Sequence, residues 1–145
     1  MGELYLRARM KRPPSGQRER LGLGKMLALG FVFLWFFIGG IAHFTATGVE
    51  MKIIPPWMPE HRLMVQISGA FELIGALGIL VPRTRRVAGM GLALLTLAVT
   101  PANVYMWQRA ELFPMIPYWI LTLRLPLQAA LIICIWWASQ RRILI

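Results

Sequence analysis

The chain has 145 residues, of which 57% are hydrophobic and 15% charged, and its formal net charge is +10. Typical soluble domains contain about 45–50% apolar and about 25% charged residues. A water-soluble fold of this length would lack the polar residues to cover its surface, so the composition predicts a membrane protein. The positive charge does not indicate a nucleic-acid partner, because the basic residues lie at the ends of apolar segments, where they orient a protein in the membrane.

The first 25 residues form a basic stretch that contains seven of the sixteen Lys and Arg residues. We interpret residues 1–25 as a cytoplasmic tail, which either contacts anionic lipid head groups or remains solvated. This stretch is not expected to be a cleavable signal peptide, because the following apolar run is about 20 residues long and no small-x-small site ends it. The first apolar segment is therefore expected to stay as an anchor.

Four apolar segments follow, and each is long enough to cross about 30 Å of hydrocarbon as a helix of about 20 residues. The connections are short, especially "PRTRR" at 82–86, so consecutive helices are expected to be antiparallel neighbours. The sequence therefore predicts an all-α, integral membrane, up-down four-helix bundle over residues 26–140. The predicted spans are 26–46, 63–81, 87–107 and 117–139.

Lys and Arg are distributed unevenly between the two sides of the predicted bundle. Twelve lie in the tail, the 82–86 turn and the carboxyl terminus, and three lie in the loops at 47–62 and 108–116. Because loops rich in Lys and Arg stay inside, both termini are expected in the cytoplasm.

The outer loop, "TGVEMKIIPPWMPEHR" at 47–62, contains three prolines, two methionines and Trp57. An indole ring is favourable at the membrane–water interface. The loop is expected to be a rigid segment at this interface, and it either caps the outer end of the bundle or is an ordinary interfacial loop.

Polar residues within the predicted spans converge on the outer half of the bundle. Glu72 has no charged neighbour for nine residues on either side. At 1.5 Å per residue, Glu72 lies ~14 Å and Arg124 ~10 Å from the outer ends of their spans, and His43 and Asn103 lie ~5–6 Å from theirs. Ionisable groups inside a membrane usually face the protein interior or a wet cavity. The candidate ligand-binding residues are His43, Trp57, Gln66, Glu72, Asn103 and Arg124.

Glu72 and Arg124 are expected to form an ion pair, because their predicted depths differ by only ~4 Å and a buried charge requires a partner. This pair would be either structural or part of a binding site. His43 or Asn103 could satisfy Glu72 instead. His43 could also be a plain interfacial residue, and Asn103 could serve only to bridge two helices by a hydrogen bond.

Two prolines are expected to distort the last two spans. Pro101 removes a backbone donor and should bend the third span just before Asn103, whose amide could then meet the freed carbonyl groups. Pro126 should kink the fourth span beside Arg124.

No motif for self-contained catalysis is found. The sequence has no nucleotide-binding loop, no metal or haem ligand spacing and no Ser-His-acid set. The single cysteine, Cys134, lies in an apolar run and is interpreted as a core or lipid-facing residue. We therefore predict no catalytic residues and no metal ligands, and at most a role as a subunit of an oxidoreductase.

Five short motifs stand out between residues 39 and 107. They are "GGIAHF" at 39–44, "PPWMP" at 55–59, "SGAFELIGALGILVP" at 68–82, "TRRVAG" at 84–89 and "PANVYM" at 101–106. With these motifs, residues 39–107 resemble the DoxX-like family of small four-helix membrane proteins, and residues 117–139 resemble it in hydropathy only. The family is named after a small subunit of an archaeal thiosulfate–quinone oxidoreductase. The resemblance implies a multi-pass protein of the bacterial inner membrane with a link to a redox complex, and it transfers no catalytic residue.

Three functions follow from these observations. The first is an inner-membrane subunit that binds a quinone or another small lipophile and associates with an oxidoreductase, which makes a quinone the candidate cofactor. The second is a non-catalytic assembly or accessory subunit of a larger membrane complex. The third is a small proton-coupled transporter. The expected partners are the lipid bilayer and proteins of a membrane complex.

Overall fold

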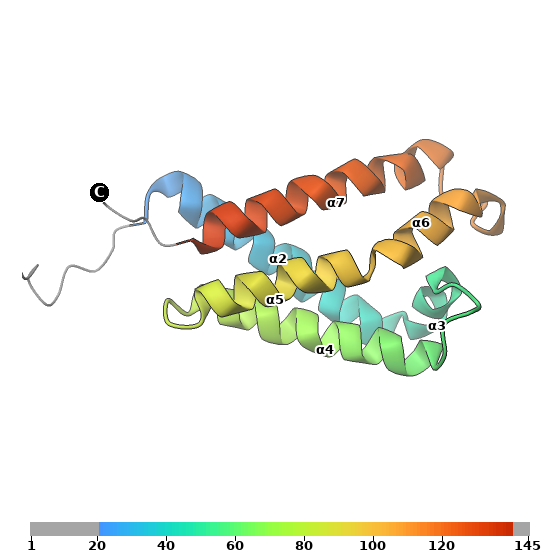
Figure 1. The fold of residues 1–145 in the computed structure, drawn as a ribbon, viewed down its shortest axis with the longest axis horizontal. Coiled ribbons are helices and arrows are strands. Elements are labelled where there is room, and N and C mark those ends of the chain that lie inside the picture. Colours follow the sequence, from blue (N-terminus) through green and yellow to red (C-terminus); the bar gives the residue numbers. More distant parts are fainter. Residues whose placement is uncertain (1–20, 141–145) are drawn as a thin grey trace, which may run out of the picture.

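The computed structural model describes residues 21–140, and this part of the chain is helical with no strand (Figure 1). The all-α prediction is therefore confirmed for these residues. The basic tail up to residue 20 and the last five residues lie outside the described part, as do the predictions made for them. The helices are α2 (Leu23–Thr45), α3 (Thr47–Glu50), η1 (Met51–Ile53), α4 (His61–Leu80), α5 (Arg85–Ala98), α6 (Thr100–Gln108), η2 (Ala110–Leu112) and α7 (Tyr118–Ser139).

Four helical stretches are long and apolar enough to cross a membrane, as the sequence predicts. They begin and end within three residues of the predicted limits. Their outward sides carry large exposed apolar residues, among them Phe31, Ile74, Leu94 and Ile133. An apolar surface of this extent is unfavourable in water and suits contact with lipid. The stretches are Leu23–Thr45, His61–Leu80, Arg85–Gln108 and Tyr118–Ser139.

The long helices lie side by side, and the loops between them gather at two ends (Figure 1). We call the end with α3 and η2 the α3 end and the opposite end, with the turn between α4 and α5, the turn end. α4 packs against α2 and α5, whereas α7 packs against α2, α5 and α6. α4 and α7 therefore lie diagonally across the group, separated by the other helices.

Small residues allow the backbones of α2 and α4 to touch. A Cβ atom on Gly40 would lie 3.1 Å from the carbonyl oxygen of Gly69, and a Cβ on Gly69 would lie 2.6 Å from the Cβ of His43. Glycines at such crossings let membrane helices approach closely. This approach brings the last turns of α2 directly over the first half of α4.

The packed core lies toward the turn end. Lys25, only 7% exposed, closes this end by donating a hydrogen bond from Nζ to the carbonyl oxygen of Gln140 at 2.6 Å. Its ammonium group also lies 6.0 Å from the centroid of the Trp137 ring. The start of α2 is thus tied to the end of α7. The core residues are Leu29, Val32, Phe36, Ala76, Ile79, Leu92, Leu131, Ile135 and Ala138.

The third apolar stretch is broken at Val99, between α5 and α6. Pro101 has no N–H group to donate to the carbonyl four residues earlier, which accounts for the interruption. The predicted bend is therefore found, and it lies two residues before the proline. α7, in contrast, continues through Pro126 as one helix.

Gly69→Ala is predicted to destabilise the protein, because the new Cβ would collide with His43 and with the ring of Phe44 at 3.0 Å. Overpacking of this kind costs about 1–3 kcal/mol. Thermal unfolding in detergent measures the effect. Gly91→Ala is the matched control, because a Cβ there meets no atom within 4 Å. Equal unfolding temperatures for the two variants would show that the α2–α4 contact does not limit stability.

Candidate functional site

A cavity of about 650 Å³ lies between the long helices toward the α3 end. Residues of α2, α4, α5, α6 and α7 line it, and most of the lining side chains are apolar. Phe36 and Leu131 belong both to the lining and to the packed core, so they form the floor of the cavity. The helix group is thus solid toward the turn end and hollow toward the α3 end.

The segment after α3 covers the cavity at the α3 end. Ile53, Ile54 and Met58 line the cavity, and Ile54 and Pro55 are buried. Of the two interpretations of the loop at 47–62, these contacts favour a cap on the helix group over an ordinary interfacial loop. Trp57 does not take part, because its side chain is 73% exposed and lies outside the lining. Its predicted role in ligand binding has no support in this geometry.

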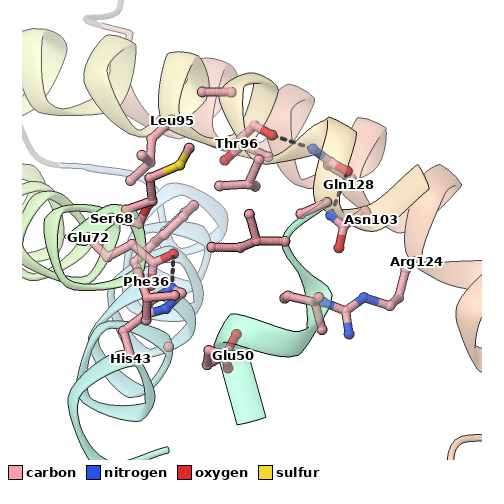
Figure 2. A pocket seen from close by; sticks show the side chains of 18 of the residues that line it. Phe36, His43, Glu50, Ser68, Glu72, Leu95, Thr96, Asn103, Arg124 and Gln128 are labelled. Atoms are coloured by element: carbon pink, nitrogen blue, oxygen red, sulfur yellow. Dashed lines mark hydrogen bonds and ion pairs between the residues drawn. The ribbon is translucent and has the colours of Figure 1, made fainter. Parts of the chain in front are cut away.

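His43 and Glu72 form a pair on the α2–α4 wall of the cavity (Figure 2). His43 Nε2 and Glu72 Oε1 are 3.3 Å apart, and the two side chains are 16% and 13% exposed. Since a carboxylate only accepts, Nε2–H is the donor when Glu72 is ionised. The other carboxylate oxygen lies beside Gly39, where a Cβ would come within 2.7 Å of it. Glycine at position 39 therefore makes room for this carboxylate.

The sequence-based prediction of an ion pair between Glu72 and Arg124 is wrong. Among residues 21–140, Glu72 pairs with His43, and Arg124 forms no ion pair. Both residues line the cavity, but α4 and α7 are diagonal rather than adjacent. The observed helix starts also place Glu72 ~16 Å and Arg124 ~9 Å along their helices, which widens the difference in depth to ~7 Å. His43, on the helix next to α4, is the closer partner.

A second polar cluster joins the α5–α6 break to α7. Gln128 Nε2 donates hydrogen bonds to the carbonyl oxygen of Thr96 and to Thr100 Oγ1, the latter at 2.7 Å. Asn103 Nδ2 donates to Gln128 Oε1 at 2.9 Å. Gln128 therefore satisfies the backbone at the break, and Asn103 bridges two helices through Gln128 rather than meeting a freed carbonyl itself.

Two charged residues of the lining have no partner within the described part of the chain. Arg124 on α7 and Glu50 on α3 line the cavity, and neither side chain forms an ion pair or hydrogen bond with residues 21–140. Figure 2 shows Arg124 on the opposite side of the cavity from His43 and Glu72. Its guanidinium N–H groups are therefore free to bind a molecule in the cavity.

Four of the six candidate residues line the cavity: His43, Glu72, Asn103 and Arg124. Gln66, like Trp57, lies outside the lining, because it is on another face of α4 than Ser68. Four polar lining residues were not among the candidates: Glu50, Ser68, Thr96 and Gln128. The sequence held no signal for Glu50, because it lies on α3, beyond the end of α2 at Thr45.

Double-mutant cycles are predicted to show coupling between His43 and Glu72 and none between Glu72 and Arg124. His43→Ala and Glu72→Ala should show a coupling free energy of about 0.5–3 kcal/mol, because the side chains touch. Glu72→Ala and Arg124→Ala should be additive within about 0.5 kcal/mol. Unfolding by denaturing detergent gives the free energies. Coupling between Glu72 and Arg124 as large as that with His43 would contradict this geometry.

The chain was compared with known proteins and protein families. No curated protein and no solved structure matches the chain. A family model, described as a domain of unknown function (DUF8561), matches residues 32–139, which include every residue that lines the cavity. The chain therefore belongs to the DUF8561 family.

Proposed function

We propose that the chain is a multi-pass membrane protein, an up-down four-helix bundle of the bacterial inner membrane with both termini in the cytoplasm. Four apolar helical stretches and their exposed apolar sides support insertion. The turn end supports the orientation, because Arg83 lies in the turn between α4 and α5, Arg85 and Arg86 begin α5, and positively charged turns stay inside. The α3 end, with its cavity, then faces the outer half of the membrane.

The cavity binds a small lipophile with a polar ring, and an isoprenoid quinone is the best candidate. The observation that carries this proposal is the cavity itself, since ligand sites are typically apolar with a few convergent polar groups. The polar groups lie on opposite walls: His43 with Glu72, and Arg124 with Asn103 (Figure 2). A quinone has oxygen atoms at opposite ends of its ring, which matches this distribution.

The two walls would act on the ring in different ways. Arg124 would donate hydrogen bonds to one carbonyl oxygen and hold the ring in place. The His43–Glu72 pair lies at the other side and could give a proton to, or take one from, the second oxygen. The electrons would come from an oxidoreductase associated with this chain. The resemblance to the DoxX-like family supports the association with an oxidoreductase, and this association is a prediction.

Proton-coupled transport is the second candidate, and the α5–α6 break favours it. Ala98, Val99 and Ala102 line the cavity at this break. Non-helical backbone at membrane depth occurs where it lines a cavity, and broken helices form the binding sites of many transporters. A purely accessory role is the third, and a stable stoichiometric protein partner without any ligand would favour it.

Titration of the purified protein with ubiquinone-2 in an isothermal calorimeter tests the proposal. We expect saturable binding of one molecule per chain. Arg124→Leu should weaken it about tenfold to a hundredfold, because a hydrogen bond to a charged group contributes about 1.5–3 kcal/mol. Arg109→Leu is the matched control, since Arg109 is 61% exposed and lies outside the cavity.

Two results would contradict the proposal. The first is the absence of saturable binding to the wild-type protein. The second is equal affinity of the Arg124→Leu and Arg109→Leu variants, which would mean that the probe binds somewhere other than the cavity.

A further inference from the structure

We infer that the apolar chain of the ligand leaves the cavity sideways, along a groove between α2 and α7. This inference rests on the proposed function, because it assigns a path to the chain of the same molecule whose ring lies in the cavity. The groove is a second hollow of about 190 Å³. Its lining residues are Phe31, Trp35, Leu127, Ala130, Leu131 and Cys134.

The groove adjoins the cavity. Trp35, Leu127 and Leu131 line both hollows, so these three side chains form the boundary that the ligand's apolar chain would cross. No charged side chain lines the groove, and its only polar groups are the Cys134 thiol and the indole N–H of Trp35. The charged groups thus belong to the cavity, and the path out of it is mainly apolar, which is the division that an amphiphile with one polar end requires.

The helical spacing explains why the groove is straight and open. Phe31 and Trp35 are one turn apart on α2, and Leu127, Leu131 and Cys134 follow one face of α7. Phe31, Trp35 and Leu127 are each more than 40% exposed, so the groove opens on the outer surface of the helix group. Leu131, at 6% exposure, forms its base. A chain in the groove would touch protein on one side and lipid on the other.

The distances suit a lipid that enters from the bilayer. Twelve residues of α2 separate His43 from Phe31, or ~18 Å along the axis, which is more than half of the ~30 Å hydrocarbon thickness. With its ring near His43, the ligand would extend its chain toward the membrane centre, in the direction of a lipid chain in the same leaflet. It would therefore enter without turning over.

An open groove also predicts the specificity of the site. The cavity encloses the ring and selects it through polar groups on both walls, whereas a chain longer than the groove would continue into the lipid. We expect affinity to rise with the first isoprene units, which fill the groove, and then to become independent of chain length.

Cys134 provides a direct reporter, because it is the only cysteine of the chain and lines the groove. The experiment follows the alkylation of Cys134 by N-phenylmaleimide in proteoliposomes, with ubiquinone-0, which has no chain, or ubiquinone-2, which has two isoprene units. We expect ubiquinone-2 at saturation to slow alkylation at least tenfold. Ubiquinone-0 should leave the rate unchanged, because its ring stays in the cavity.

Two tryptophan variants complete the test. Ala130→Trp would fill the groove, so it should lower the affinity for ubiquinone-2 to that for ubiquinone-0 and leave ubiquinone-0 binding intact. Ala129→Trp is the matched control, because Ala129 is the preceding residue of α7, is exposed, and lines neither hollow. Retained ubiquinone-0 binding shows that each variant is folded. If Ala130→Trp does not fold, the alkylation rates of the wild-type protein decide alone.

The outcomes distinguish this inference from the proposed function. If ubiquinone-2 binds at one molecule per chain but Cys134 reacts at its free rate, the groove is not the path and the cavity proposal stands. Equal affinity of the Ala129→Trp and Ala130→Trp variants for ubiquinone-2 would overturn the inference in the same way. If the wild-type protein binds neither probe, both proposals fail.

Discussion

Backbone contact between α2 and α4 at Gly40 and Gly69 is the constraint on which the site depends. A side chain at either position would collide with the opposite helix, so the glycines fix how closely the two axes approach. At this separation His43 reaches Glu72, and Gly39 leaves space for the second carboxylate oxygen. An unpaired carboxylate that is only 13% exposed would be costly, so the glycine contact and the His43–Glu72 pair support each other.

The helix group divides into a solid and a hollow half, and the polar residues follow this division. Toward the turn end, apolar side chains fill the interior, and Lys25 joins the start of α2 to the end of α7. Toward the α3 end, the helices surround the cavity, and Gln128 satisfies the backbone at the α5–α6 break. The amide of Gln128 is thus satisfied within the protein, whereas His43 Nδ1 is buried without a hydrogen-bond partner among residues 21–140. Arg124 and Glu50 are the charged lining residues that form no ion pair within this part of the chain.

The sequence predicts the helical class and the four long apolar stretches, because hydropathy over about 20 residues determines both. It also predicts that His43, Glu72 and Asn103 lie toward the same end of the long helices, because helical rise converts sequence position into distance along a helix, and all three line one cavity. Depth alone does not decide which side chains meet. Consecutive helices are neighbours, so α4 and α7 lie diagonally, and for this reason the predicted pair of Glu72 with Arg124 is wrong. Gln128 was not predicted as a site residue, because its partners Thr96 and Thr100 lie at the break in the third stretch, and the sequence does not fix the position of this break.

Native mass spectrometry of the protein, released directly from its own membrane, tests most directly whether the cavity is a binding site. The proposed function predicts one tightly held adduct per chain with the mass of an isoprenoid quinone, still bound after activation that removes phospholipids. Such a molecule would have its ring between the two polar walls that hold His43 and Arg124. A spectrum of the bare chain, or of the chain with only a variable number of weakly held phospholipids, would contradict the account.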